Sequence, residues 1–262
     1  MKRFFSTFLI MAMLAAVLIG CGNKDFDTDA YKEKLNNILW SSIEDTEFAI
    51  SDLIAYDGVL PDEAAYAFLE VVNTVGYSLD NAMLADDFVK PELNENSYIS
   101  PRYSESLELY GTNYIAIHKA LSGKLSEAFE DYLRLMTKYN SSYMIDDSAL
   151  QITWDELAQF LIDWSNFEIK YPEFFPMEIE GALDFGFMLY SGQATLDNTP
   201  LIVDDKLSPE VQASYEGFLA YPENEICAYY TNIKILYEMW KTNDFKYTEQ
   251  VKEVINLLRP TE

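Results

Sequence analysis

The chain has 262 residues, of which 44 are Asp or Glu and 18 are Lys or Arg, giving a formal net charge of −26. Hydrophobic residues make up 49% of it and aromatic residues 15%, which argues against a disordered chain in spite of the charge. The charge also argues against nucleic acid as a partner, because an acidic protein repels phosphate. The length suits one large domain or two small ones.

The first 24 residues have the pattern of an export signal. Lys2 and Arg3 form a short positive segment, residues 4–19 are almost all apolar, and the small residue Gly20 precedes Cys21. This order is typical of a secretory signal peptide. The alternative is a transmembrane anchor with an incidental cysteine, for which an apolar run of this length is short.

The motif Leu18-Ile19-Gly20-Cys21 resembles the lipobox of bacterial lipoproteins, and the resemblance covers only these first 21 residues. It implies that Cys21 is alkylated with diacylglycerol, that residues 1–20 are a cleaved signal peptide and that residues 21–28 form a lipidated tether. The expected location is the bacterial cell envelope, on the outer membrane facing the periplasm or on the outer face of the plasma membrane in a one-membrane cell. The mature chain then carries a charge of −28, because the removed segment holds two bases and no acid.

The second cysteine, Cys227, has no partner for an intrachain disulfide if Cys21 carries lipid. It lies in an apolar, helical pattern, so we expect it to be buried as a small hydrophobe. No later segment predicts a membrane span, because the best candidate, residues 179–190, is broken by Glu180 and Asp184.

The chain reads as helices from end to end. The first predicted helix covers residues 28–56, where apolar side chains recur close to every 3.6 residues. Gly58 follows as a helix-ending glycine, and a second helix is predicted for residues 61–83. Residues 86–101 lose the period and predict a long loop. A third helix is expected over residues 107–121.

Further helices follow in the C-terminal half. A break at Gly123 precedes a helix over residues 125–136, and Thr153 and Glu156 form a capping-box pair at the next helix start. The remaining predicted features are a polar connection at 140–151, a helix over 179–190 ended by Gly192, a loop at 193–206 with an extended piece at 199–203, a helix start at 208–210, and helices through 226–240 and 251–258.

These elements predict an all-α fold, an irregular globular bundle of about eight or nine helices. No segment repeats at a fixed period, which argues against a regular helical-repeat array. We expect residues 29–262 to form a single all-α domain.

Few residues have the chemistry of a catalytic centre. His118 is the one histidine, and we expect it at the edge of an apolar face, bonded to a neighbour. No Gly-x-Ser-x-Gly motif is present, and residues 122–124 fail as a phosphate loop because Leu125 replaces the Ser or Thr. We therefore predict no catalytic residue and no cofactor, and lean towards a protein that is not an enzyme.

Carboxylates are numerous but do not form a metal-binding motif. Asp25, Asp27 and Asp29 begin like a calcium loop, yet Ala30 stands where glycine is needed and Asn36 where a glutamate is needed. We predict no metal site of the usual kind, and weak binding of divalent cations at acidic pairs stays open.

The 19 tyrosines are the remaining candidates for recognition. At helical spacing most are expected in the core, but Tyr98, Tyr103 and Tyr229 are candidates for a partner surface, because tyrosine buries area while its hydroxyl stays wet.

Three hypotheses for function follow. The favoured one is a membrane-anchored, extracytoplasmic module that binds a basic protein partner, of the immunity or assembly type, through an acidic and aromatic face. The second is a small-ligand or glycan-binding lipoprotein with an aromatic-lined cleft. The third is a hydrolase, which requires two carboxylates that converge in a cleft.

Overall fold

The computed structural model describes residues 25–36, 42–84, 88–103, 108–140 and 144–260. The predicted signal peptide and Cys21 lie outside the described residues. Within them, the chain forms ten α-helices, one 3-10 helix and three two-stranded antiparallel hairpins. The predicted all-α class is confirmed. The expected eight or nine helices fall short of the observed number because the first predicted helix is two.

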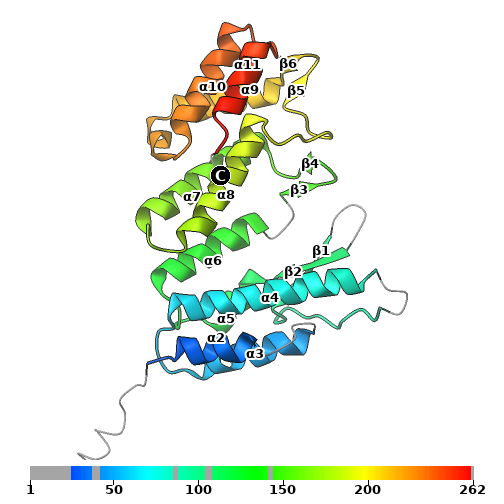
Figure 1. The fold of residues 1–262 in the computed structure, drawn as a ribbon, viewed down its shortest axis with the longest axis vertical. Coiled ribbons are helices and arrows are strands. Elements are labelled where there is room, and N and C mark those ends of the chain that lie inside the picture. Colours follow the sequence, from blue (N-terminus) through cyan, green and yellow to red (C-terminus); the bar gives the residue numbers. More distant parts are fainter. Residues whose placement is uncertain (1–24, 37–41, 85–87, 104–107, 141–143, 261–262) are drawn as a thin grey trace, which may run out of the picture.

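The elements follow one another along the chain in the order of Figure 1. The N-terminal half comprises α2 (Thr28–Asn36), α3 (Ile43–Ala55), α4 (Asp62–Ala82), β1 (Ile99–Tyr103), β2 (Glu108–Thr112), α5 (Tyr114–Ala120) and α6 (Glu127–Asn140). The C-terminal half comprises β3 (Ile145–Asp146), β4 (Ala149–Leu150), α7 (Trp154–Lys170), α8 (Pro176–Ser191), β5 (Ile202–Val203), β6 (Lys206–Leu207), α9 (Pro209–Ala220), η1 (Pro222–Ile226), α10 (Tyr230–Thr242) and α11 (Glu249–Leu257).

The helices are stacked in tiers along the long axis of the molecule (Figure 1). The pair α2 and α3 lies at one end and packs against α4, α6 packs against α7, and α9, α10 and α11 lie at the other end. One continuous cluster of buried hydrophobic side chains extends from Tyr31 in α2 to Ile255 in α11. The tiers therefore share a core.

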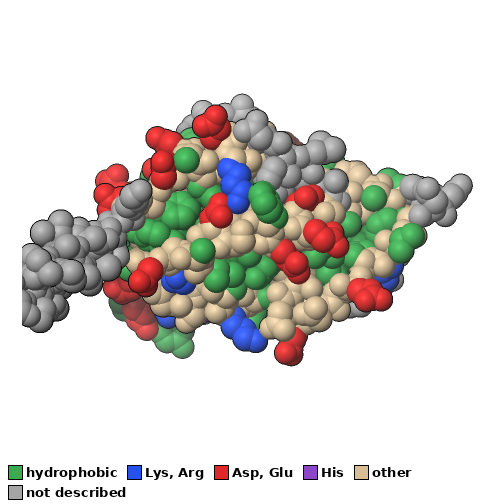
Figure 2. All heavy atoms as spheres, turned by 90° about the horizontal axis from the view of Figure 1, so that it is seen from below, with side chains coloured by type: hydrophobic (Ala, Val, Ile, Leu, Met, Phe, Trp, Pro, Cys, Tyr) green, Lys and Arg blue, Asp and Glu red, His purple; other side chains and the backbone are tan. Residues whose placement is uncertain are grey.

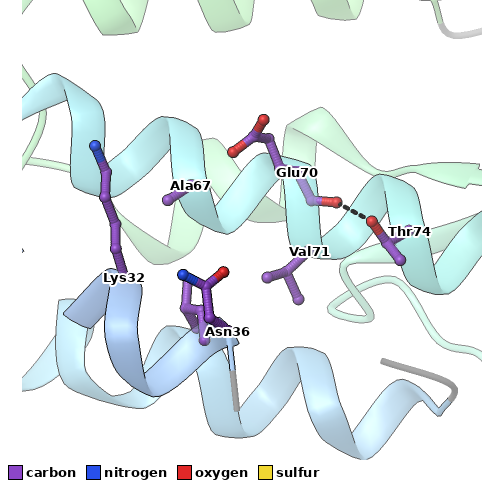
Figure 3. A pocket seen from close by; sticks show the side chains of 7 residues that line it. Lys32, Asn36, Ala67, Glu70, Val71 and Thr74 are labelled. Carbon is purple, nitrogen blue, oxygen red and sulfur yellow. Dashed lines mark hydrogen bonds between the residues drawn. The ribbon is translucent and has the colours of Figure 1, made fainter. Parts of the chain in front are cut away.

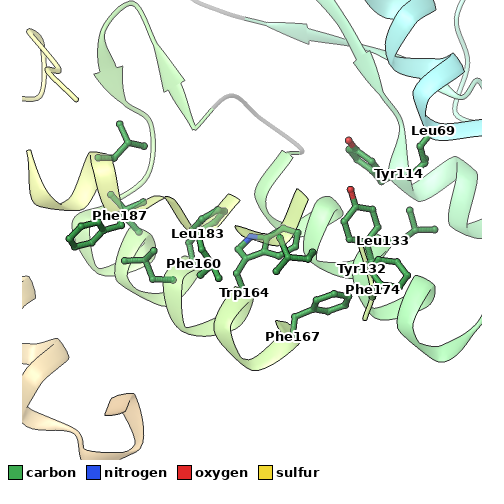
Figure 4. Close-up of a cluster of buried hydrophobic side chains, with 14 of the residues drawn as sticks. Leu69, Tyr114, Tyr132, Leu133, Phe160, Trp164, Phe167, Phe174, Leu183 and Phe187 are labelled. Atoms are coloured by element: carbon green, nitrogen blue, oxygen red, sulfur yellow. The ribbon is translucent and has the colours of Figure 1, made fainter. Parts of the chain in front are cut away.

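The centre of that core is aromatic (Figure 4). The ring of Phe174, which precedes α8, lies 5.7 Å from Phe129 of α6, 5.4 Å from Tyr132 of α6 and 5.4 Å from Phe167 of α7, measured between centroids. Tyr132 also meets Trp164 edge to face at 6.0 Å. The Phe174–Phe129, Phe174–Phe167 and Tyr132–Trp164 pairs are edge to face, and contacts of this kind stabilise beyond the apolar area that they bury. This cluster therefore joins α6, α7 and the start of α8.

The predicted continuous helix over residues 28–56 is wrong. Ser42 has an extended backbone, with φ −135° and ψ 162°, and its N–H donates to the Asp45 carboxylate at 2.9 Å. This is the backbone geometry of a helix N-cap, and it starts α3 as a new helix. Residues 37–41, between the two helices, lie outside the described residues.

The predicted helix over residues 107–121 is wrong in its first half. Residues 108–112 form β2, which pairs antiparallel with β1 from Ile99 opposite Thr112 to Tyr103 opposite Glu108. The hairpin lies against α4, where Gly76 permits the approach, because a Cβ there would stand 3.1 Å from the Tyr110 carbonyl oxygen. The predicted loop over 86–101 correspondingly ends in β1.

The predicted helix through residues 226–240 begins later than expected. Residues 222–226 form the 3-10 helix η1, and α10 begins at Tyr230. Cys227 caps η1 and is buried, with 3% of its surface exposed, so its predicted burial is confirmed although its predicted helical position is not.

Several helix boundaries are as predicted. Thr153 Oγ1 accepts from the N–H of Glu156 at 3.1 Å, and the Glu156 carboxylate accepts from the Thr153 N–H at 2.7 Å, which completes the capping box of α7. Gly192 ends α8 in the left-handed conformation at φ +78°, and Ser208 Oγ accepts from Val211 N–H at the start of α9.

A short turn motif recurs before four helices without a fixed period. The motif is a bend or turn of two residues, then two linking residues, and then the N-cap of the next helix, which is a proline, serine or threonine. It occurs in residues 57–64, 122–129, 204–211 and 244–251. The motifs associate in pairs: Leu60 N–H donates to Lys124 O at 2.7 Å, and Leu207 N–H donates to Phe245 O at 2.9 Å. Each pair ties together segments that are far apart in the sequence.

The net charge predicts a stability that rises with salt. Like charges at this density oppose the compact state, and salt screens them over a Debye length that shortens from about 30 Å at 0.01 M to about 8 Å at 0.15 M. We expect the melting temperature of residues 22–262, followed by circular dichroism, to rise between low salt and about 0.3 M. A fall would show that the ion pairs outweigh the repulsion.

Candidate functional site

The structure places about a third of the tyrosines of the described segments in the interior. Six of them are buried, with at most 7% of their surface exposed: Tyr31, Tyr110, Tyr114, Tyr132, Tyr190 and Tyr215. The hydroxyls of Tyr31, Tyr190 and Tyr215 are hydrogen-bonded where two helices meet, as when Tyr190 Oη and Ser214 Oγ lie 2.9 Å apart. Recognition by tyrosine therefore falls to the half-buried and exposed ones.

The three tyrosines singled out from the sequence do not form one surface. Tyr98 is half-buried before β1, with its ring edge to face against Phe68 of α4 at 5.6 Å. Tyr103 is the last residue of β1, and its side chain lies outside the described part of the structure. Tyr229 lies just before α10, and Figure 1 places β1 and α10 in different tiers.

Tyr229 is held by contacts to α8. Its ring stacks on Phe187 at 4.1 Å between centroids and 3° between planes, and its hydroxyl donates to the carboxylate of Asp184. Burial raises the pKa of Tyr229, and so do the Asp184 hydrogen bond and the negative charges of Asp184, Glu180 and Glu168. Asp184 therefore contacts the Tyr229 hydroxyl, and Glu168 of α7 and Glu180 of α8 lie close enough for their negative charges to act on it.

Met177 extends this surface along α8. Met177, Glu180 and Asp184 are spaced i, i+3 and i+7 and so share one side of the helix. The Met177 side chain is 80% exposed. We call Glu168, Met177, Glu180, Asp184 and Tyr229 the Tyr229 face. It combines the exposed Met177 thioether, the half-buried ring of Tyr229 and three carboxylates.

No described base neutralises the Tyr229 face. Lys170 follows Glu168 on α7, but its ammonium pairs with Glu127 and Asp131 of α6 at 2.8 and 2.9 Å. Among the described residues, no lysine or arginine lies within ion-pair distance of Glu168, Glu180 or Asp184. The face is thus a patch of negative potential with an apolar component.

The groove between α6 and α7, in contrast, is internally neutralised. Burial pushes the pKa of Asp131 up, but hydrogen bonds from Lys170 and Tyr171 outweigh it and lower that pKa. The pKa of Asp163 is lowered in the same way by Lys138 and Tyr139. Both carboxyls are held ionised, which is the opposite of what a general acid needs.

A cleft of about 480 Å³ lies between α2 and α4 (Figure 3). Its apolar part comes from Ala67 and Val71, and its polar rim from Lys32, Asn36 and Glu70. The Lys32 ammonium forms an ion pair at 3.0 Å with Glu63, a residue that does not line the cleft. The cleft ends at residue 36, next to residues that are not described, so we assign it no function.

Among the described residues, no group of side chains has the arrangement of a catalytic centre or of a metal site. His118 lies half-buried on α5, and the buried Cys227 has its pKa raised by burial, which disfavours a reactive thiolate. In these ranges, no three His, Cys, Asp or Glu side chains gather closely enough to hold a metal ion.

No helix in the described part of the chain is both long and apolar enough to span a bilayer. Comparisons with protein-family models, with curated proteins and with solved structures found no match to this chain.

Proposed function

We propose that this protein is a bacterial lipoprotein, held on the extracytoplasmic side of a membrane through Cys21, that binds a basic protein partner. The observation that carries the proposal is the Tyr229 face, where Asp184 contacts a stacked tyrosine, two more carboxylates act on it through their charge, and no lysine or arginine of the described residues pairs with any of the three. A partner of the immunity or assembly type, docked in the cell envelope, fits this surface.

The anchor part of the proposal is supported by the sequence. A basic start, an apolar run and Leu-Ile-Gly-Cys at residues 18–21 coincide at the beginning of the chain. A lipid-anchored protein needs no membrane-spanning helix of its own.

The binding part is supported by the physics of charged interfaces. Complementary fields speed encounter and reject like-charged competitors, whereas aromatic and Met side chains supply contact area once the complex has formed. The Tyr229 face contains both elements. The mature charge of −28 also opposes contact with nucleic acid.

Neutralising the face tests the proposal. Residues 22–262 are immobilised and exposed to envelope extracts, and bound proteins are identified by mass spectrometry as the salt is raised. We expect basic proteins to be captured by the wild type and largely lost by the double variant Glu168→Gln/Glu180→Gln. For a purified partner, association should slow steeply with salt while dissociation changes less.

The matched control is Glu238→Gln/Glu253→Gln, which removes the same two charges from exposed positions on α10 and α11. This variant should retain the partner. Capture of only acidic or neutral proteins, or equal loss of binding in both variants, would contradict a specific role for the Tyr229 face.

A further inference from the structure

A second cleft, of about 570 Å³, lies between α3 and the segment 94–98 that leads into β1. It lies near the α2–α3 end of the stack, whereas the Tyr229 face belongs to α7, α8 and the start of α10. Ile50 and Ile54 of α3 provide an apolar wall, and the Ile54 side chain is 44% exposed. The volume falls in the range of small-ligand sites.

The polar groups of this cleft are only partly used within the protein. Asn94 Oδ1 accepts from the Asn96 N–H at 2.9 Å, and Asn96 Oδ1 accepts from Lys119 Nζ at 2.9 Å. These bonds fix the amide oxygens, so the Nδ2 groups of both asparagines remain as donors. The Glu47 carboxylate and the Tyr98 hydroxyl also line the cleft and have no hydrogen-bond partner in the described part of the chain.

The charges around the cleft disfavour ions of either sign. Glu47 repels an anion, and its negative charge adds to burial in raising the pKa of Tyr98. The ammonium of Lys119, bonded to Asn96, repels a cation. Figure 2 views the molecule from this end, where carboxylates are spread over the surface and bases stand singly between them. A neutral polar ligand is repelled neither by the Glu47 carboxylate nor by the Lys119 ammonium.

The arrangement of donors, acceptors and ring matches the chemistry of a sugar. Each sugar hydroxyl both donates and accepts, so neighbouring hydroxyls can donate to a carboxylate while they accept from amide N–H groups. The apolar C–H side of a sugar ring can pack against an aromatic ring. Glu47, the two asparagines and Tyr98 supply these groups on one cleft.

We propose that the cleft between α3 and residues 94–98 binds a neutral sugar unit, with Glu47 accepting from its hydroxyls, Asn94 and Asn96 donating to them, and Tyr98 packing against the ring. This inference goes beyond the proposed protein-binding function and uses none of the Tyr229 face. The two can therefore fail independently.

Titration of residues 22–262 with cellotriose, a neutral trisaccharide of glucose, tests the inference by calorimetry and by saturation-transfer NMR. We expect binding with a Kd of about 1 mM or tighter. Glucosamine, a cation, and glucuronate, an anion, should each bind more weakly than glucose itself. Glu47→Gln should raise the Kd about tenfold or more, because hydrogen bonds to an ionised acceptor are the strong ones.

Glu44→Gln is the matched control, since it makes the same change one turn earlier on α3, at an exposed position outside the cleft. It should leave the Kd unchanged, whereas Tyr98→Ala should abolish binding. Circular dichroism spectra verify that each variant is folded, and Tyr98→Phe, which keeps the ring, should retain part of the affinity. No binding of cellotriose, or binding that Glu47→Gln leaves intact, overturns the inference.

Discussion

Cys21→Ser should leave the protein without acyl chains and with residues 1–20 still attached, because it removes the thiol on which lipid-dependent removal of the signal peptide depends. The physical reason is the loss of the thiol that carries the acyl chains, each buried methylene of which contributes about 0.8 kcal/mol to membrane binding. Phase partitioning followed by immunoblotting, together with mass spectrometry of the N-terminus, measures the result.

Cys227→Ser is the control for the anchor, because Cys227 is the other cysteine and lies buried in the domain. This variant should remain in the detergent phase. A wild-type protein that stays aqueous would contradict the lipoprotein proposal. A wild-type protein whose N-terminus carries no acyl chains and still includes residues 1–20 would indicate that residues 4–19 remain as a transmembrane anchor instead.

Phe174→Ala should lower the free energy of unfolding by about 3–5 kcal/mol, because it removes a buried ring from the packed aromatic core. Phe174 is 6% exposed, and its ring contacts Phe129, Tyr132 and Phe167 in the centre of the stack. If residues 29–262 form a single domain, the whole chain should still unfold in one transition at lower urea. Circular dichroism and tryptophan fluorescence, recorded on the same samples, test this.

Phe185→Ala provides the comparison on α8, since the Phe185 side chain is 46% exposed. Its effect should stay near 0.5 kcal/mol or less, as for most surface substitutions. Two separate transitions in Phe174→Ala would show that the tiers unfold independently, and the single-domain prediction would then be wrong.

Helix boundaries could be predicted from the sequence where short-range chemistry sets them. The Thr153–Glu156 capping box, Gly192 and the Ser208 cap each involve residues within a few positions of one another, so their signals are local. The break at Ser42 was missed because the apolar spacing continued through it, although its cap geometry is equally local.

The β1–β2 hairpin could not be predicted in the same way. Leu107, Tyr110, Gly111 and Tyr114 are spaced i, i+3, i+4 and i+7, which fits a helix face. The strand forms because residues 108–112 pair with β1 and pack on α4 beside Gly76. Gly76 lies 34 positions before Tyr110, so the contact that favours the strand is distant in the sequence, and tertiary contacts override the local pattern.

The candidate surfaces could be predicted only in part. Tyr98 and Tyr229 were found from tyrosine's amphipathic character, but their neighbours come from distant segments. Asp184 lies 45 positions before the Tyr229 hydroxyl that it accepts from, and Glu47 reaches the Tyr98 cleft from α3. With 44 carboxylates in the chain, no pattern in the sequence selects these few.

If Cys21 anchors the chain as proposed, the order of the tiers gives the molecule an end near the bilayer and an end away from it. The chain enters at α2, only seven positions after Cys21, and each further tier is added in sequence order away from that end (Figure 1). With the chain tethered at Cys21, the cleft between α3 and residues 94–98 would lie near the lipid headgroups. The Tyr229 face would lie farther from the membrane, because the intervening tiers separate it from the tether. The number of tiers would then set the distance from the membrane at which the Tyr229 face can meet a partner.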